Sequence, residues 1–162
     1  MEVISGPSVV EHPDRPCLGI RVVTPFRGMF AVRDQLMAEL YGWLDERGVQ
    51  AGTTFFRLHV IDMAGPMDVE VGVLTDGPVE GDDRVRAGVL PAGRYATLVY
   101  VNHGLRANKA LLDWAAAEGL TLDRADDPAG DRFGCRYEAY LTDPRAERMK
   151  TRWQIELAFR LA

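Results

Sequence analysis

Hydrophobic positions along the chain follow two different periods. Apolar residues recur every three or four positions over residues 28–47 and 105–118, which predicts an amphipathic helix in each segment. Short apolar runs that are bounded by turn residues predict strands at residues 17–24, 54–62, 68–75, 94–101, 133–141 and 151–161. Residues 123–131 and 142–149 are expected to be loops, and residues 1–15 a short N-terminal arm.

The order strand–helix–strand–strand occurs twice, over about residues 16–76 and 85–162, with an acidic, turn-rich linker between them. The two helices also align at an offset of 71, where leucine, tryptophan and glycine recur: Leu40, Trp43 and Gly48 match Leu111, Trp114 and Gly119. A unit of this size buries too little surface to be secure alone. We therefore expect one α+β domain over residues 1–162, a tandem pseudo-symmetric repeat with a ligand cleft at the junction.

Composition and charge narrow the function classes. The chain has 162 residues, 47% hydrophobic and 27% charged, and no apolar run long enough to span a membrane is present. Nineteen Lys+Arg against 24 Asp+Glu give a net charge of −5, which argues against non-specific nucleic-acid binding. The N-terminal residues do not resemble a secretory signal, and only Cys17 and Cys135 are present. We expect two free thiols and a cytoplasmic location.

Several kinds of catalytic or cofactor site lack their sequence signals. Serine occurs only at positions 5 and 8, which argues against a serine nucleophile on a rigid element. Neither GxxxxGK[ST] nor GxGxxG occurs, and His12, His59 and His103 have no metal-ligand spacing. We expect no metal and no cofactor, so any chemistry rests on carboxylates, tyrosines and other aromatic residues.

An ordered set of short motifs points to a family. The set is Leu90-Pro-Ala-Gly-Arg-Tyr-Ala96, Asn102-His-Gly104, Leu111-Leu-Asp-Trp114 and Tyr137-Glu-Ala-Tyr-Leu-Thr-Asp-Pro144. From about residue 17 to its C-terminus the chain resembles the GyrI-like small-molecule-binding family. That family includes effector-binding domains of bacterial multidrug-sensing regulators and stand-alone gyrase-inhibitor-like proteins. The resemblance implies a fold of two strand–helix–strand–strand units.

Two departures from the family pattern matter. Residues 1–15 are too few for the helix-turn-helix domain of the family's transcription regulators, so we expect the stand-alone form. Many members read Thr-Glu-Ile in the last strand, where this chain reads Trp153-Gln154-Ile155. An amide thus replaces one family carboxylate, and any role of that carboxylate is in doubt here.

The strand at residues 133–141 carries the main candidate. Alternation places Arg136, Glu138 and Tyr140 on one face, and the opposite face is the better core face. The resemblance implies that Glu138 is the cleft carboxylate of the family's Glu-x-Tyr motif. The alternative is an exposed glutamate paired with Arg136 or Arg152. Further candidates for the cleft wall are Tyr140, Trp153, Trp114, Tyr41, Phe56 and His59.

Three functions compete. The first is a stand-alone binding protein for bulky aromatic small molecules, with cations among the candidates because Glu138 could pair with one. The second is a hydrolase of strained electrophilic natural products, with Glu138 as general base and Tyr140 polarising the leaving oxygen. The third is a protein inhibitor of a topoisomerase. The expected partner is a small molecule, with no nucleic acid and no membrane; the sequence does not indicate an oligomeric state.

Overall fold

The computed structural model describes residues 1–162 and shows the expected α+β fold. Two helices, α1 (Met29–Arg47) and α2 (Gly104–Ala117), accompany ten strands. The strands are β1 (Glu2–His12), β2 (Arg15–Pro25), β3 (Thr54–Ile61), β4 (Pro66–Leu74), β5 (Arg86–Leu90), β6 (Gly93–Val101), β7 (Arg124–Asp127), β8 (Gly130–Phe133), β9 (Arg136–Tyr140) and β10 (Gln154–Arg160). A short 3-10 helix, Lys150–Arg152, precedes β10.

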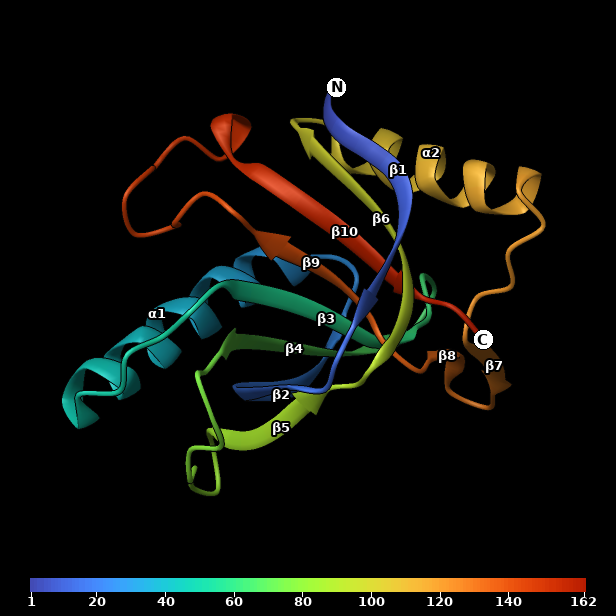
Figure 1. Ribbon diagram of the computed structural model, residues 1–162. Helices are drawn as coiled ribbons and strands as arrows, with labels where there is room; N and C mark the ends of the chain where they lie inside the picture. The colour runs from blue at the N-terminus through green and yellow to red at the C-terminus, as the bar shows by residue number, and fades with distance from the viewer.

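All ten strands join one antiparallel sheet, whose main path runs β1-β6-β10-β9-β3-β4-β2-β5 (Figure 1). Read outward from the central β3–β9 pair, the first half runs β3-β4-β2 and the second half runs β9-β10-β6. The strand that precedes each half in sequence pairs with the other half. β1, which precedes the first half, pairs with β6 of the second half, and β5, which precedes the second half, pairs with β2 of the first. The two halves therefore share one continuous sheet, and the internal duplication in sequence stays a prediction.

Several segments differ from their expected structure. The strand β5 is not among the expected strands, and residues 151–152, which are expected to begin the last strand, lie in the 3-10 helix. Two further differences concern whole segments. The N-terminal arm is the strand β1, which pairs with β6 from Glu2 to His12. The expected loop at residues 123–131 contains β7 and the start of β8, which form a small hairpin. Local pattern is a weak guide in both cases, because a strand is stabilised by its cross-strand partners and β7 (RADD) is poor in strand-forming residues.

Both helices pack on the same face of the sheet, α1 against β2 and β4 and α2 against β6 and β10 (Figure 1). Leu40 of α1 and Leu111 of α2 are fully buried, whereas Trp43 and Trp114, near the C-terminal ends of the same helices, are half-buried. Neither helix has the length and apolar character that a membrane span requires. The matched leucine and tryptophan positions thus have similar burial in the two halves.

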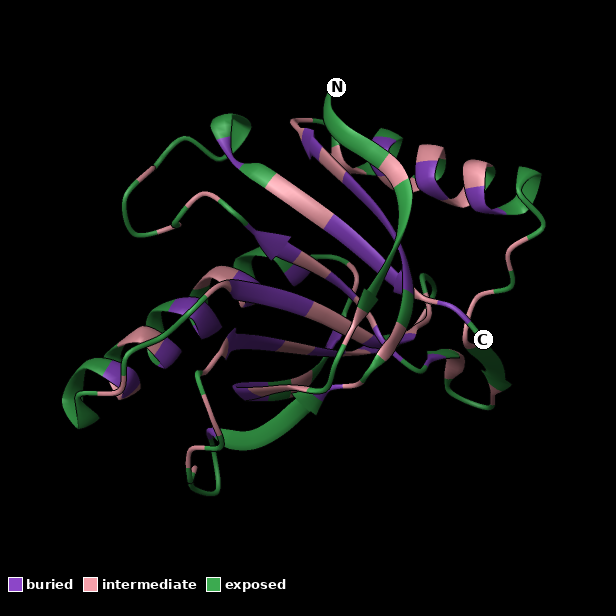
Figure 2. Cartoon of the chain, viewed as in Figure 1, coloured by how far each residue is buried: buried purple, intermediate pink, exposed green.

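The opposite face of the sheet has a core of its own. Phe55, Tyr95 and Tyr137 are buried there, together with the free cysteines Cys17 and Cys135. Figure 2 shows that the inner strands are buried over most of their length, while β1 and β5 are largely exposed. The central strands β3 and β9 are therefore covered on both faces, and any polar side chain on them needs a partner.

Candidate functional site

Glu138 lies at the centre of the sheet, on the face that carries both helices. Its strand, β9, runs between β3 and β10, and Glu138 is in register with Phe56 on one side and Leu157 on the other. Tyr140 belongs to the core cluster on the helix face, whereas Tyr137 and Ala139 belong to the cluster on the opposite face. The predicted alternation along this strand is therefore present.

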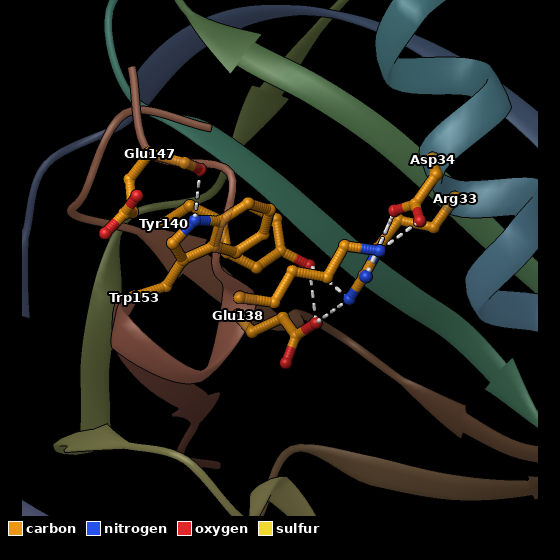
Figure 3. A network of polar contacts seen from close by, with 7 residues as sticks. Arg33, Asp34, Glu138, Tyr140, Glu147 and Trp153 are labelled. Atoms are coloured by element: carbon orange, nitrogen blue, oxygen red, sulfur yellow. Dashed lines mark hydrogen bonds and ion pairs between the residues drawn. The ribbon is translucent and has the colours of Figure 1, made fainter. Parts of the chain in front are cut away.

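A network of polar contacts holds the Glu138 carboxylate (Figure 3). The Tyr140 hydroxyl donates a hydrogen bond to Glu138 Oε1 over 2.5 Å. Arg33, which is buried in α1, places Nη1 3.5 Å from the same oxygen and donates to Tyr140 Oη over 3.3 Å. The partner of Glu138 is thus Arg33, not Arg136 or Arg152; Arg152 instead lies 3.7 Å from Glu147. The Glu138 side chain keeps 16% of its surface exposed.

Polar contacts with Asp34 also hold the Arg33 guanidinium in place. Its Nε and Nη2 both donate to Asp34 Oδ1 over 3.1 Å, and Lys150 forms an ion pair with Asp34 Oδ2. This group, which we call the Arg33 network, contains Arg33, Lys150, Asp34 and Glu138. Its two cations and two carboxylates balance, so the charge of Glu138 is already compensated within the protein.

Burial changes the pKa values of Glu138 and Tyr140. Loss of water raises the pKa of Glu138, while the Tyr140 hydroxyl and the Arg33 guanidinium act against that rise. Burial, together with the negative charge of Glu138, also raises the pKa of Tyr140 well above its usual value. Tyr140 therefore stays a hydrogen-bond donor at neutral pH, and Glu138 is its acceptor.

Two adjoining cavities of about 300 Å³ each open between the N-terminal ends of the helices. Both are lined by Phe30 of α1, Leu105 and Asn108 of α2, and Glu138, and together we call them the helix-side cleft. One cavity is mostly apolar, with Phe26, Met29, Phe56, Met67, Leu157 and Phe159 in its wall. The other is more polar, with Arg33, Tyr100, Asn102, His103 and Lys150. Phe30 and Leu105 are 49% and 78% exposed at the rim.

The backbone before α2 explains the Asn-His-Gly motif. Asn102 and His103 both have positive φ, 61° and 67°, a region in which asparagine and histidine occur more often than most residues. A Cβ at Gly104 would lie only 3.0 Å from the Tyr100 hydroxyl oxygen. Burial, and then the charge of Glu138, raise the pKa of Tyr100, so this hydroxyl stays protonated beside the cleft. The motif thus lets α2 begin directly against the cleft wall.

Three predicted wall residues lie near Glu138. Phe56 lines the apolar cavity, and Tyr140 contacts the carboxylate directly. Trp153 stands behind Tyr140, with ring centroids 5.3 Å apart in an edge-to-face arrangement, and its Nε1–H donates to the Glu147 carbonyl over 2.8 Å (Figure 3). Trp153 therefore supports the site from behind and does not line the helix-side cleft.

The other three candidates lie elsewhere. Tyr41 is hydrogen-bonded to Thr54 over 2.7 Å and lines a separate cavity at the far end of α1. Trp114 packs against the core beneath α2. His59 lies on the opposite face of the sheet, because Phe56 and His59 are an odd number of residues apart on one strand. The structure does not bring Tyr41, Trp114 or His59 to Glu138.

Sequence reasoning missed the residues that the helices contribute. Arg33, Phe30, Leu105 and Asn108 come from the first turns of α1 and α2, and none lies on the apolar stripe that predicted the helices. Their one signal is that Phe30 and Leu105 are large apolar side chains off that stripe. Exposed apolar residues next to a cavity are typical of ligand-binding surfaces.

The family comparison gives the class of protein, a small-molecule-binding domain. A model of the GyrI-like small molecule binding domain matches residues 6–162, and the chain belongs to this family. No curated protein matches the chain in sequence.

Several solved structures share the fold. EcmrR in a complex with DNA aligns with a TM-score of 0.74 at 18% identity, over 95% of this chain and 56% of the EcmrR chain. The isolated EcmrR C-terminal domain aligns with a TM-score of 0.67 at 16% identity, over 96% of both chains.

SAV2435 bound to tetraphenylphosphonium aligns with a TM-score of 0.59 at 10% identity, over 96% of this chain and 93% of that one. A hydrolase from Listeria innocua aligns with a TM-score of 0.60 at 12% identity, over 96% of this chain and 91% of that one. At these identities the likeness establishes the fold.

Proposed function

We propose that this chain binds bulky aromatic small molecules in the helix-side cleft. The observation that carries the proposal is an apolar cavity of about 300 Å³ with a hydrogen-bonded carboxylate, Glu138, in its wall and exposed apolar residues at its rim. Ligand pockets commonly combine a largely apolar lining with a few polar groups in this way. The family description and the ligand in the SAV2435 structure support the same reading.

A cationic ligand competes with Arg33 for Glu138 in this cleft. Glu138 already has the Arg33 guanidinium at 3.5 Å, so a cation gains the full attraction of the carboxylate only if Arg33 moves away. Arg33 retains Asp34 as a partner when it does so. We therefore propose aromatic character as the general requirement, with a cation bound at Glu138 through exchange with Arg33.

Binding can be tested with N-phenyl-1-naphthylamine, a neutral aromatic probe, in calorimetric titrations. Leu105→Ala removes an apolar side chain from the rim, and burial of a leucine is worth up to about 2 kcal/mol. The variant should bind the probe more weakly, by up to roughly thirtyfold. Leu141→Ala is the matched control, because Leu141 is 49% exposed and does not line the helix-side cleft. Equal losses in both variants, or no binding to the parent chain, would contradict the proposal.

Tetraphenylphosphonium tests the exchange at Glu138. Glu138→Gln keeps the shape of the side chain and removes its charge, so the cation should bind roughly tenfold to a hundredfold more weakly, the scale of hydrogen bonds to charged groups. The neutral probe should lose much less. If the variant weakens both ligands equally, Glu138 does not act as the partner of the cation.

A second function, hydrolysis, is favoured by one observation. Glu138 lines the cleft and has a raised pKa, and the Tyr140 hydroxyl, which is not in the cleft wall, donates to it over 2.5 Å, so a base lies in the wall with a proton donor behind it. One solved structure with this fold is a hydrolase. If this chain hydrolyses an electrophilic aryl ester, Glu138→Gln should still bind the ester but cleave it about a hundredfold more slowly in single-turnover assays. Equal cleavage rates would eliminate this function for Glu138.

A further inference from the structure

Arg136 occupies the same strand and the same face as Glu138, two residues earlier, and it lines the apolar cavity of the helix-side cleft. Its guanidinium lies over two aromatic rings, with Cζ 4.3 Å from the centroid of Phe159 and 4.9 Å from that of Phe133. These rings hold the flat guanidinium in place through cation–π contacts. Phe133 and Phe159 therefore fix the position of the Arg136 guanidinium in the cleft wall.

The hydrogen bonds of Arg136 are few. Nη2 donates to Asn108 Oδ1 over 3.1 Å, and the buried Nε has no acceptor. Nη1 has no acceptor either, and no carboxylate lies within ion-pair distance; the charge of Asp131, which is itself paired with Arg124, acts on Arg136 only from farther away. Burial lowers the pKa of Arg136 to about 10, so the group is still a cation at neutral pH. Arg136 is a partly buried positive charge with a single, uncharged acceptor.

Arg57, on the opposite face of the sheet, provides a contrast. Its Nε is also buried without an acceptor. However, its two terminal nitrogens donate to backbone carbonyls, Nη1 to Val89 over 3.2 Å and Nη2 to Gly134 over 2.9 Å. Arg57 thus joins two segments of the chain, whereas Arg136 leaves donor capacity unused at the wall of an apolar cavity.

The charges around the helix-side cleft do not cancel once Arg136 is included. The Arg33 network balances within itself, so the uncompensated charge at this cleft is positive. A buried cation without a counter-charge is costly, and an acceptor brought by a ligand would relieve that cost. Guanidinium groups suit this task because their donors match carboxylate and sulfonate oxygens in pairs.

We propose that Arg136 is an acceptor-binding subsite, and that the helix-side cleft prefers aromatic molecules carrying an acidic group over neutral or cationic molecules of the same shape. The proposal rests on the binding function proposed above and narrows its ligand class. The aromatic rings of such a ligand would occupy the apolar cavity, and its carboxylate or sulfonate would accept from Arg136. Asn108 acts as a positioning residue for the guanidinium.

A matched pair of probes tests this preference. 8-Anilinonaphthalene-1-sulfonate differs from N-phenyl-1-naphthylamine by one sulfonate group, and calorimetry measures both affinities. In the parent chain the sulfonate should bind roughly tenfold to a hundredfold more tightly, the range for a hydrogen bond to a charged group. In Arg136→Met the two affinities should become nearly equal, because the neutral probe loses little. Arg57→Met, the same change on the opposite face, should leave their ratio as in the parent chain.

The outcomes separate the two proposals. If the neutral probe does not bind the parent chain, the binding function itself fails. If the neutral probe binds but the sulfonate is no tighter, or if Arg136→Met keeps the preference, only the acceptor subsite is overturned. Should Arg136→Met not fold, the parent chain still decides the question through biphenyl-4-carboxylate and biphenyl-4-carboxamide, which share a shape and differ in the charge of the acceptor group. The subsite requires the carboxylate to bind more tightly, and equal affinities or a tighter amide would overturn it.

Discussion

The two faces of the sheet each hold a cavity with a hydrogen-bonded glutamate, and the cavities differ in character. The helix-side cleft contains Glu138 with Tyr140 and Arg33. On the opposite face a cavity of about 760 Å³, which we call the back basin, contains Glu70, whose Oε1 lies 2.7 Å from His59 Nε2. Five arginines line the back basin: Arg21, Arg57, Arg84, Arg86 and Arg132. It is larger than either cavity of the helix-side cleft and far more polar.

The charges of the back basin are largely satisfied within the chain. Arg21 pairs with Asp68, Arg84 with Glu39 and Arg132 with Asp127, at 2.7–3.0 Å. These pairs are partly exposed, so water also serves them. The helix-side cleft combines an apolar lining with Arg136, which donates one hydrogen bond, to Asn108, and whose buried Nε has no acceptor. This contrast is why we propose the ligand site in the helix-side cleft, where an unmet polar group lies in an apolar wall, and not in the larger and more charged back basin.

The neighbouring residues Phe55 and Phe56 provide the largest expected effect. They are both buried, and they face opposite sides of the sheet. Phe55→Ala and Phe56→Ala should each lower the free energy of unfolding by about 3–5 kcal/mol, measured by urea denaturation. The milder Phe55→Leu and Phe56→Leu variants separate the faces, since only the second should change the affinity for N-phenyl-1-naphthylamine. An equal change in both would mean that the probe does not bind in the helix-side cleft.

The second-largest expected difference is in how much stability is lost when the ion pair of each cavity is broken. Arg33→Met removes the partner of buried Glu138, and breaking a buried pair typically costs about 3 kcal/mol. Arg21→Met removes a pair in which the arginine side chain is about half exposed, for which about 0–1 kcal/mol is expected. Chemical denaturation of both variants at pH 7 measures the difference. Similar losses would show that Arg33 contributes no more than a surface arginine.

The Arg33→Met penalty should also depend on pH. Burial raises the pKa of Glu138 in the folded chain, so the folded state binds more protons than the unfolded state between the two pKa values. Stability from this group is therefore present at low pH and lost as pH rises through the folded pKa. Without Arg33 the loss becomes larger, and Arg33→Met should be more destabilising at pH 8 than at pH 5. A penalty that is constant with pH would contradict this account of Glu138.

His59 gives the smallest effect and tests the back basin. Burial lowers the pKa of His59 from 6.5, against the hydrogen bond that His59 donates to Glu70, which raises it. The folded state therefore binds fewer protons than the unfolded state just below pH 6.5, and stability is lost as pH falls through that range. His59→Gln should show a smaller loss of unfolding free energy between pH 7.5 and pH 5.5 than the parent chain. His103→Gln, at an exposed position, is the control and should keep the parental loss.

Sequence pattern alone determined a large part of the fold. The periods of apolar residues located both helices and the inner strands to within a few residues, because those elements bury a regular face of their own. The ordered motifs from Leu90 to Pro144 led to the family, which the match over residues 6–162 shows. Alternation along β9 put Glu138 and Tyr140 on one face, and this follows from strand geometry without any partner.

Only the tertiary structure decided which side chains meet. The pairing of β1 with β6 and of Glu138 with Arg33 joins segments about a hundred residues apart, and no local pattern encodes either contact. The same holds for Arg136, which the sequence offered as a partner for Glu138 and which instead lies over Phe159 beside Asn108. Local periodicity tells which face a residue occupies, but the charge balance of a cleft depends on what several distant elements bring to it. That is why the cleft carboxylate could be predicted from the sequence, whereas its counter-ion and the unpaired arginine beside it could not.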